Sequence, residues 1–245
     1  MGLTASIRRH FSTAFSQMGV KYALLHICAK VSQRLFDQHC IPSYSQFGED
    51  RIIDAFFQGK REGFYVDVGC NRPIAYSNTW LLYKSGWRGV VIDANPDVIA
   101  MFSEVRPRDL SETAVVSDRQ REVDFFTSRV SDLISGIGEK TDGFWQRTDD
   151  NSQVSRRHTI TLQSILERNQ VPRDFDLLSV DVEGEDLGVL RSLDLVQFRP
   201  RLIVVEIHGF DLAAPARSDL YRHLAAQQYE LIGYSRPSAF FQRTT

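Results

Sequence analysis

Seven short apolar runs alternate with stretches of helical composition from residue 64 onward, and this alternation restricts the fold more than any other feature. The runs are rich in β-branched and aromatic residues and cover 64–68, 89–94, 113–116, 176–182, 201–207, 229–234 and 239–242. Strands with this composition, without alternating polar positions, are typical of a sheet whose two faces are both covered by helices. Strands that alternate with helices form a parallel α/β sheet, so we predict that fold class.

The segments between the runs have helical composition at 79–84, 98–105, 162–168, 187–193 and 218–227, and another helix is expected at 49–57 before the first strand. Only about four residues separate the last two runs, which is too few for the crossover that parallel strands need. We therefore predict a C-terminal antiparallel hairpin at the sheet edge.

Residues 1–43 form a separate N-terminal extension, and residues 44–245 form the main domain. Apolar residues recur at helical spacing over 11–36, with basic residues between them, which predicts an amphipathic helix. Such a helix can make peripheral contact with a membrane surface or a lipid-linked substrate, or it can pack on the main domain or on a second subunit. The polar segment 130–158 is expected to be a long loop, either a lid or an insertion.

The charges exclude some partners. The chain of 245 residues has 29 Lys and Arg against 31 Asp and Glu, a balance that argues against a nucleic-acid partner.

The cysteines indicate a cellular location. The sequence contains Cys28, Cys40 and Cys70, which show no C-x-x-C spacing and no secretory signal before them, so we expect the protein to lie in the reducing cytoplasm. We expect no transmembrane segment, because the apolar stretch 20–31 is short and contains charged residues. The oligomeric state is not readable.

A glycine turn and a downstream carboxylate indicate a nucleotide site. The first strand runs into Gly69 and Asn71, and the second strand ends at Asp93, 24 residues after that glycine. In nucleotide-binding sheets an acidic residue about 20 residues after the turn binds the ribose hydroxyls. Both elements follow parallel strands, where open α/β sheets bind their ligands.

The turn favours a donor without phosphates. It lacks G-x-G-x-x-G, so the second glycine that admits a pyrophosphate is missing. Asp67 lies in the same region, where its carboxylate repels phosphates and attracts cations. S-adenosylmethionine, with a ribose, a sulfonium and an ammonium but no phosphate, suits Asp67 and Asp93 better than NAD does. A nicotinamide-dependent oxidoreductase is the disfavoured alternative.

Acidic residues and a histidine follow the fourth and fifth strands. Asp181 and Glu183 are expected to point to one side as the strand ends, and Glu206 and His208 project from the next strand. Clustered carboxylates raise one another's pKa toward values useful for a base, and a histidine beside a carboxylate can be a base, a metal ligand or a structural residue. We select Asp181, Glu183 and His208 as catalytic candidates.

Seven segments together resemble the FkbM family of S-adenosylmethionine-dependent methyltransferases. They lie in order at 44–50 (YSQFGED), 66–71 (VDVGCN), 77–79 (SNT), 86–96 (GWRGVVIDANP), 161–166 (TLQSIL), 179–185 (SVDVEGE) and 205–208 (VEIH). The resemblance implies the class I, Rossmann-like methyltransferase fold, with a seven-stranded sheet whose final hairpin inserts one antiparallel strand. It also implies O-methylation of small molecules, sugars or glycolipids. Many members of the family have Glu where this chain has Asp93, and the shorter side chain should still reach a ribose diol.

Within the family, the length and the basic leading helix are most similar to bacterial enzymes that methylate a deoxyhexose, including the nodulation fucose 2-O-methyltransferases of rhizobia. This resemblance implies a 6-deoxyhexose acceptor, such as fucose or rhamnose, on a glycolipid or a lipo-oligosaccharide such as a Nod factor. A polyketide or another small-molecule hydroxyl, and a non-catalytic glycan-binding role, remain alternatives.

The resulting hypothesis is a cytoplasmic O-methyltransferase. We assign Asp67, Gly69, Asn71 and Asp93 to S-adenosylmethionine. We assign Asp181, Glu183 and His208 to acceptor orientation and proton removal, with His208 as the first choice for the base. No metal ligand is assigned. In a variant of the hypothesis, Asp181, Glu183 and His208 hold a divalent cation that polarises the acceptor hydroxyl.

Overall fold

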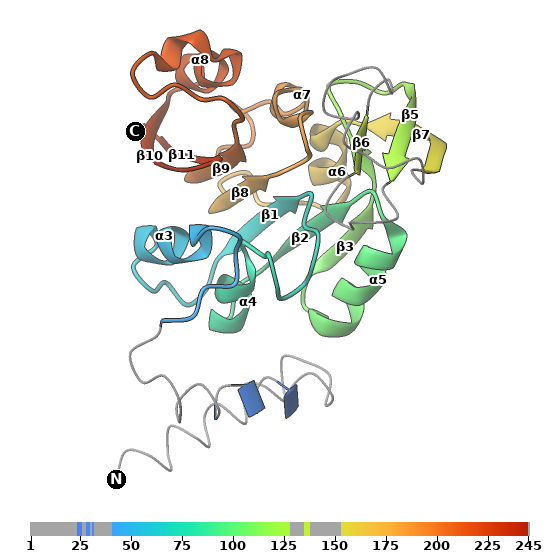
Figure 1. Cartoon of the computed structure of the whole chain (residues 1–245), viewed down its shortest axis with the longest axis vertical. Helices are drawn as coiled ribbons and strands as arrows, with labels where there is room; N and C mark the ends of the chain where they lie inside the picture. The colour runs from blue at the N-terminus through green and yellow to red at the C-terminus, as the bar shows by residue number, and fades with distance from the viewer. Residues whose placement is uncertain are drawn as a thin grey trace.

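The computed structural model describes residues 24–25, 28–29, 31, 41–127, 135–137 and 153–244. Its main element is a seven-stranded sheet with the strand order β10-β11-β9-β8-β1-β2-β3 (Figure 1). The strands, in chain order, are β1 (Phe64–Val68), β2 (Arg88–Asp93), β3 (Leu110–Thr113), β8 (Leu177–Val180), β9 (Leu202–Glu206), β10 (Tyr229–Ser235) and β11 (Ser238–Arg243).

The strand directions confirm the predicted fold class. β1 pairs in parallel with both β2 and β8, and β9 and β3 extend the parallel ladder on the two sides. β11 pairs antiparallel with β9 and with β10, so it is the one antiparallel strand, inserted beside the edge strand β10. This is the Rossmann-like arrangement that the family resemblance implied.

Helices cover both faces of the sheet. They are α3 (Glu49–Phe56), α4 (Trp80–Ser85), α5 (Pro96–Val105), α6 (Leu162–Arg168), α7 (Asp186–Arg191) and α8 (Asp219–Ala226), with a 3-10 turn, η2 (Pro215–Arg217), before the last. Side chains of α3, α4 and α5 pack in one apolar cluster, and those of α6, α7 and α8 pack in the other. Adjacent residues of β1 divide between the two clusters, Tyr65 in one and Val66 in the other, because successive strand side chains point to opposite faces. No helix in the described part of the chain is long and apolar enough to span a membrane.

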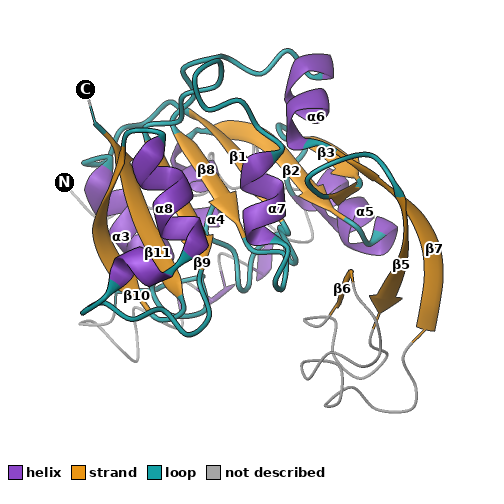
Figure 2. Cartoon of the chain, turned by 90° about the horizontal axis from the view of Figure 1, so that it is seen from above, coloured by secondary structure: helices purple, strands orange, loops and turns teal. Residues whose placement is uncertain are grey.

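A second, four-stranded sheet corrects two sequence predictions. It contains β4 (Val115–Val116), β5 (Glu122–Thr127), β6 (Ser135–Ile137) and β7 (Gln153–Ile160), and it extends from one side of the main sheet (Figure 2). The predicted strand 113–116 is therefore divided between two sheets. The predicted loop 130–158 is wrong for 135–137 and 153–158, which are strands. β7 is held by backbone hydrogen bonds to the antiparallel strand β5. Most of its side chains are polar, so the sequence contains no apolar run there that would predict a strand.

The N-terminal extension lies almost wholly outside the described residues. The described residues of the expected helix over 11–36 are Leu24, Leu25, Cys28, Ala29 and Val31; they are helical and exposed. Its role and the boundary at residue 43 stay predictions.

The buried side chain of Arg106 connects the loop after β1 to the sheet through hydrogen bonds. Arg106 is fully buried, and its Nε lies 2.8 Å from Asp109 Oδ2. It also donates to the hydroxyl of Tyr65 (2.7 Å) and to Thr79 Oγ1 (3.0 Å). Thr79 in turn donates to Asp67 Oδ2 (2.6 Å), so the network reaches a predicted site residue. Buried polar groups of this kind are stable only when each has its partner.

Arg106→Met is therefore expected to lower the free energy of unfolding by about 3 to 5 kcal/mol, because it leaves the buried carboxylate of Asp109 without its counter-ion. Urea denaturation followed by circular dichroism measures this. Arg119→Met is the matched control, since the Arg119 side chain is 69% exposed, and it should change stability by less than about 0.5 kcal/mol. Equal effects of the two substitutions would contradict the role given to the network.

Candidate active site

The parallel ladder aligns four strand ends at one edge of the sheet. Val68 pairs with Ile92 on one side and with Val180 on the other, and Val180 pairs with Val205. The residues that follow these four, in the order of the strands β2, β1, β8 and β9, are Asp93, Gly69, Asp181 and Glu206. The register thus brings residues that lie up to 137 positions apart in the sequence to one level.

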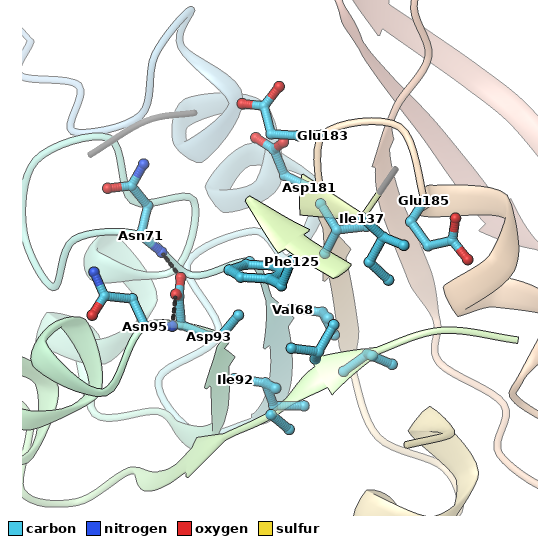
Figure 3. Close-up of a pocket in the computed structure, with 16 residues that line it drawn as sticks. Val68, Asn71, Ile92, Asp93, Asn95, Phe125, Ile137, Asp181, Glu183 and Glu185 are labelled. Carbon is cyan, nitrogen blue, oxygen red and sulfur yellow. Dashed lines mark hydrogen bonds between the residues drawn. The ribbon is translucent and has the colours of Figure 1, made fainter. Parts of the chain in front are cut away.

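A pocket lies over this edge (Figure 3). Asp93 and Asn71 line one part of it, and the acidic side chains of Asp181 and Glu183 line another. Apolar groups close the pocket, among them Val116 from β4, Phe125 from β5 and Ile137 from β6. The second sheet therefore contributes a wall of the site, which the sequence did not indicate.

Asp93 is held at the end of β2 by two backbone donors. Asn71 N–H donates to its Oδ2 (3.1 Å), and Asn95 N–H donates to its Oδ1 (2.8 Å). Burial raises the pKa of Asp93 to about 6, although these hydrogen bonds favour the charged form. Each carboxylate oxygen has a second lone pair, so both can still accept a hydrogen bond from a ligand.

Asn71 offers a free acceptor in the same pocket. It has a left-handed backbone (φ +52°), and its side-chain Oδ1 is buried and has no hydrogen-bond partner in the described part of the chain. A buried amide oxygen without a partner is costly. A ligand with an N–H or O–H donor would satisfy it.

Gly69 is required by the chain itself. Its φ is +77°, and a Cβ placed on it would lie 1.7 Å from the backbone oxygen of Asp181. The group that lies closest to the missing side chain is the Asp181 carbonyl. Gly69 also lines the pocket, as a cofactor-binding residue would.

Asp67 faces a second, adjoining pocket. Its side chain is buried within β1, and burial raises its pKa while the hydrogen bond from Thr79 lowers it. Polar side chains line this second pocket, including Gln46, Asn78 and Ser179. Asp181 and Glu183 line both pockets and so stand between them.

Asp181 and Glu183 lie in the loop after β8 rather than on the strand, which ends at Val180. Burial, with Glu206 and Asp186 adding to it, raises the pKa of Glu183 to about 7. The same causes raise the pKa of Asp181 well above its usual range. Asp186 holds this loop, because it accepts hydrogen bonds from the N–H groups of Val182 (3.2 Å) and Gly184 (3.1 Å).

Glu206 is the last residue of β9, and His208 lies two residues further on, both on the acidic side. His208 Nε2 lies 2.9 Å from Glu206 Oε2. The His208 side chain is mostly exposed and lines neither pocket, whereas Glu206 is nearly buried. The sequence had placed both residues at this edge but had selected only His208.

The segment 44–50, noted in the sequence for its family resemblance, is a loop that leads into α3, and the loop folds over the first-turn carboxylates of that helix. Asp50 accepts hydrogen bonds from Ser43 Oγ (2.6 Å), Tyr44 N–H (2.8 Å) and Ser45 Oγ (3.0 Å). This arrangement positions Gln46 at the second pocket. The motif was the one signal that could have identified Gln46 as a site residue.

The chain matches a family model and is similar to solved methyltransferase structures. The family model described as methyltransferase FkbM domain matches residues 67–231. No curated protein matches the chain. Among solved structures, the chain is similar to a TehB-like SAM-dependent methyltransferase from Corynebacterium glutamicum (15% identity, 88% of this chain and 96% of that chain, TM-score 0.43). It is also similar to an O-methyltransferase from Bacillus cereus in complex with SAH (12% identity, 94% of this chain and 88% of that chain, TM-score 0.37).

Gly69→Ala should destabilise the site far more than Gly59→Ala does. Both glycines have positive φ, which costs alanine about 1 to 2 kcal/mol, but nothing lies within 4 Å of a Cβ on Gly59. The contact with the Asp181 oxygen should add at least about 1 to 3 kcal/mol at Gly69. Urea denaturation of the two variants measures the difference, and equal stabilities would show that the Asp181 carbonyl moves aside without cost.

Proposed function

We propose that this chain, which belongs to the methyltransferase FkbM domain family and is therefore an S-adenosylmethionine-dependent methyltransferase, transfers the methyl group to a hydroxyl oxygen. The observation that carries the proposal is the meeting of two pockets at Asp181 and Glu183, one pocket suited to a nucleoside and both bordered by carboxylates. The first acceptor class to test is a 6-deoxyhexose, such as fucose or rhamnose, on a glycolipid or lipo-oligosaccharide.

The first pocket fits the adenosine part of the donor. The Asp93 carboxylate, fixed by two backbone N–H groups, has lone pairs left for the two ribose hydroxyls. The Asn71 oxygen needs a donor, and Phe125 and Ile137 offer apolar surface to a base. The carboxylates that border the pocket disfavour a pyrophosphate and therefore NAD.

The second pocket suits the cationic end of the donor. When bound, S-adenosylmethionine supplies an electrophilic methyl group on a positively charged sulfur. Asp67 and Asp181 both line this pocket, and their negative charges attract a cation. Thr79 donates a hydrogen bond to Asp67 and accepts one from Arg106, so the Asp67 carboxylate is fixed before any ligand arrives.

We assign proton removal from the acceptor to Asp181, because it is the carboxylate that reaches both pockets together with Glu183. His208, the first choice from the sequence, lines neither pocket, so we assign it with Glu183 to the acceptor side. An alcohol is a poor nucleophile until a base accepts its proton, which typically contributes about 10²- to 10⁴-fold to the rate.

Two features favour a sugar as acceptor. Gln46, Asn78 and Ser179 offer hydrogen-bond donors and acceptors to hydroxyl groups, and the ring of Tyr76 is 47% exposed beside them. Polar groups that converge beside an aromatic face are a common way to orient a small polar ligand. A cytoplasmic location, where free thiols such as Cys70 stay reduced, is part of the same proposal.

Asp93→Asn should weaken S-adenosylmethionine binding and remove its pH dependence. Below its pKa of about 6 the Asp93 carboxyl is protonated and accepts fewer hydrogen bonds, so wild-type affinity should fall by up to about tenfold per pH unit from 6 to 5. Calorimetric titrations at pH 5.0 and 7.5 test this against Asp97→Asn, which removes an equal charge from an exposed position on α5. Protonation of the donor itself affects binding to every variant equally, so it does not contribute to the difference between their pH profiles. Identical pH profiles for wild type and Asp93→Asn would remove Asp93 from the ribose site.

Asp181→Asn should lower the turnover number by at least about 100-fold while donor affinity changes little, because it removes the base but keeps the size of the side chain. Transfer of a radiolabelled methyl group to a panel of deoxyhexose glycolipids measures turnover. Asp211→Asn, at an exposed position in the loop after β9, is the charge-matched control. If Asp181→Asn keeps near-normal turnover, Asp181 is not the base; if wild type methylates no hydroxyl acceptor, the glycan-binding alternative gains support.

A further inference from the structure

Three side chains on the acidic side of the site converge in the way that metal ligands do. One carboxylate oxygen each from Glu183 and Glu206 and one ring nitrogen of His208 all lie within 4.8 Å of one another. Glu183 lies in the loop after β8, Glu206 is the last residue of β9, and His208 lies in the loop after β9. Glu183 lines both pockets, whereas neither lining includes Glu206 or His208, so the cluster borders the donor site on its acidic side.

Glu206 is the most buried member of this cluster. Only 10% of its side chain is exposed. Its buried Oε2 lies 2.9 Å from His208 Nε2 but makes no hydrogen bond in the described part of the chain. A buried carboxylate oxygen without a hydrogen bond is costly, and a cation bound by both Oε2 and Nε2 would satisfy it.

The distance between Glu206 Oε2 and His208 Nε2 is that of two neighbouring ligand atoms on one metal ion. Ligand atoms bound at about 2.1 Å and at right angles lie about 3.0 Å apart, and opposite ligands lie about 4.2 Å apart. The contact of 2.9 Å between Glu206 and His208 matches the first distance, and the 4.8 Å limit includes the second.

Apart from His208 itself, the described residues place no basic side chain at this cluster. No Lys or Arg among them lies within 4.0 Å of the carboxylates of Glu183, Glu206 or Asp181, whereas many other carboxylates have such a partner. A divalent ion would balance this excess of negative charge.

We propose that Glu183, Glu206 and His208 bind one first-row divalent transition-metal ion. Two carboxylates with one imidazole suit Mn²⁺, Fe²⁺ or Zn²⁺ better than Mg²⁺ or Ca²⁺, which prefer oxygen ligands alone. The site differs from the variant considered from the sequence, because Glu206 takes the place of Asp181. Asp181 is left free to act as the base.

The role of this ion rests on the proposed function. An ion beside Asp181 and Glu183 draws electron density from the acceptor hydroxyl, which makes its proton easier to remove. The hydroxyl proton passes to the Asp181 carboxylate, and the oxygen lone pair forms the new O–C bond. The C–S bond of the donor breaks in the same step, and its electron pair stays on sulfur, which becomes a neutral thioether.

Metal binding by the full chain tests the site without any donor or acceptor. After EDTA treatment and desalting, Mn²⁺ is added and followed by electron paramagnetic resonance and calorimetry, with Zn²⁺ as a second probe. Wild type should bind one ion per chain, and E206Q and H208A should each bind it more than about tenfold more weakly. D211N, at the exposed position described above, should match wild type.

Near-UV circular dichroism checks that E206Q is folded. H208A changes a mostly exposed side chain, so we expect it to fold, and it tests the site even if E206Q does not fold. Saturable binding that both variants lose supports the site. Absence of saturable Mn²⁺ and Zn²⁺ binding by wild type, or unchanged binding in a folded E206Q or H208A, overturns it.

Activity separates this inference from the proposed function. Methyl transfer should stop on chelation and return with Mn²⁺, while calorimetric binding of S-adenosylmethionine is unchanged by the chelator. Methyl transfer that is indifferent to chelator overturns the role of the ion and leaves the proposed function standing. Metal binding without donor binding overturns the proposed function and leaves the metal site standing.

Discussion

The parallel pairing of β1 with both β2 and β8 decides where every proposed site residue lies. Each parallel strand ends at the same edge, so the residue after each strand meets the others there. The carboxylates of Asp93, Asp181 and Glu206 are therefore level with one another although they are far apart in sequence. A shift of one residue in either pairing would turn these side chains to the other face of the sheet and disperse the site.

That edge carries several carboxylates, and the groups that surround each of them differ. Asp93 is held by backbone N–H groups, and in the proposed function it binds a neutral, hydroxyl-bearing part of the donor. Asp67 accepts a hydrogen bond from Thr79 and lines the second pocket. Within the described ranges no backbone N–H donates to the carboxylates of Asp181 and Glu183, so a positively charged ligand would stabilise their charged forms. A sulfonium donor and a divalent ion are two cations that this electrostatic arrangement accommodates.

The family resemblance and the geometry support each other at different levels. The match over residues 67–231 shows a methyltransferase domain, whereas the choice of a hydroxyl acceptor depends on how polar groups gather at the second pocket. The pocket also depends on parts of the chain that carry no recognisable motif. β5 and β6 close it with Phe125 and Ile137, and the buried Arg106 network keeps the loop after β1 in place.

The sequence by itself determined most strands of the main sheet and the helices between them, because apolar runs with glycine and proline boundaries specify strands and helices locally. It also determined that Gly69, Asp93, Asp181 and His208 follow parallel strands and so share an edge. It did not show β5–β7, whose pairing depends on backbone hydrogen bonds rather than on an apolar pattern. Nor did it show that Gly69 gives room to the chain's own carbonyl or that Glu206 is buried without a partner. Those facts depend on distances between segments remote in sequence, which only the packed tertiary structure fixes.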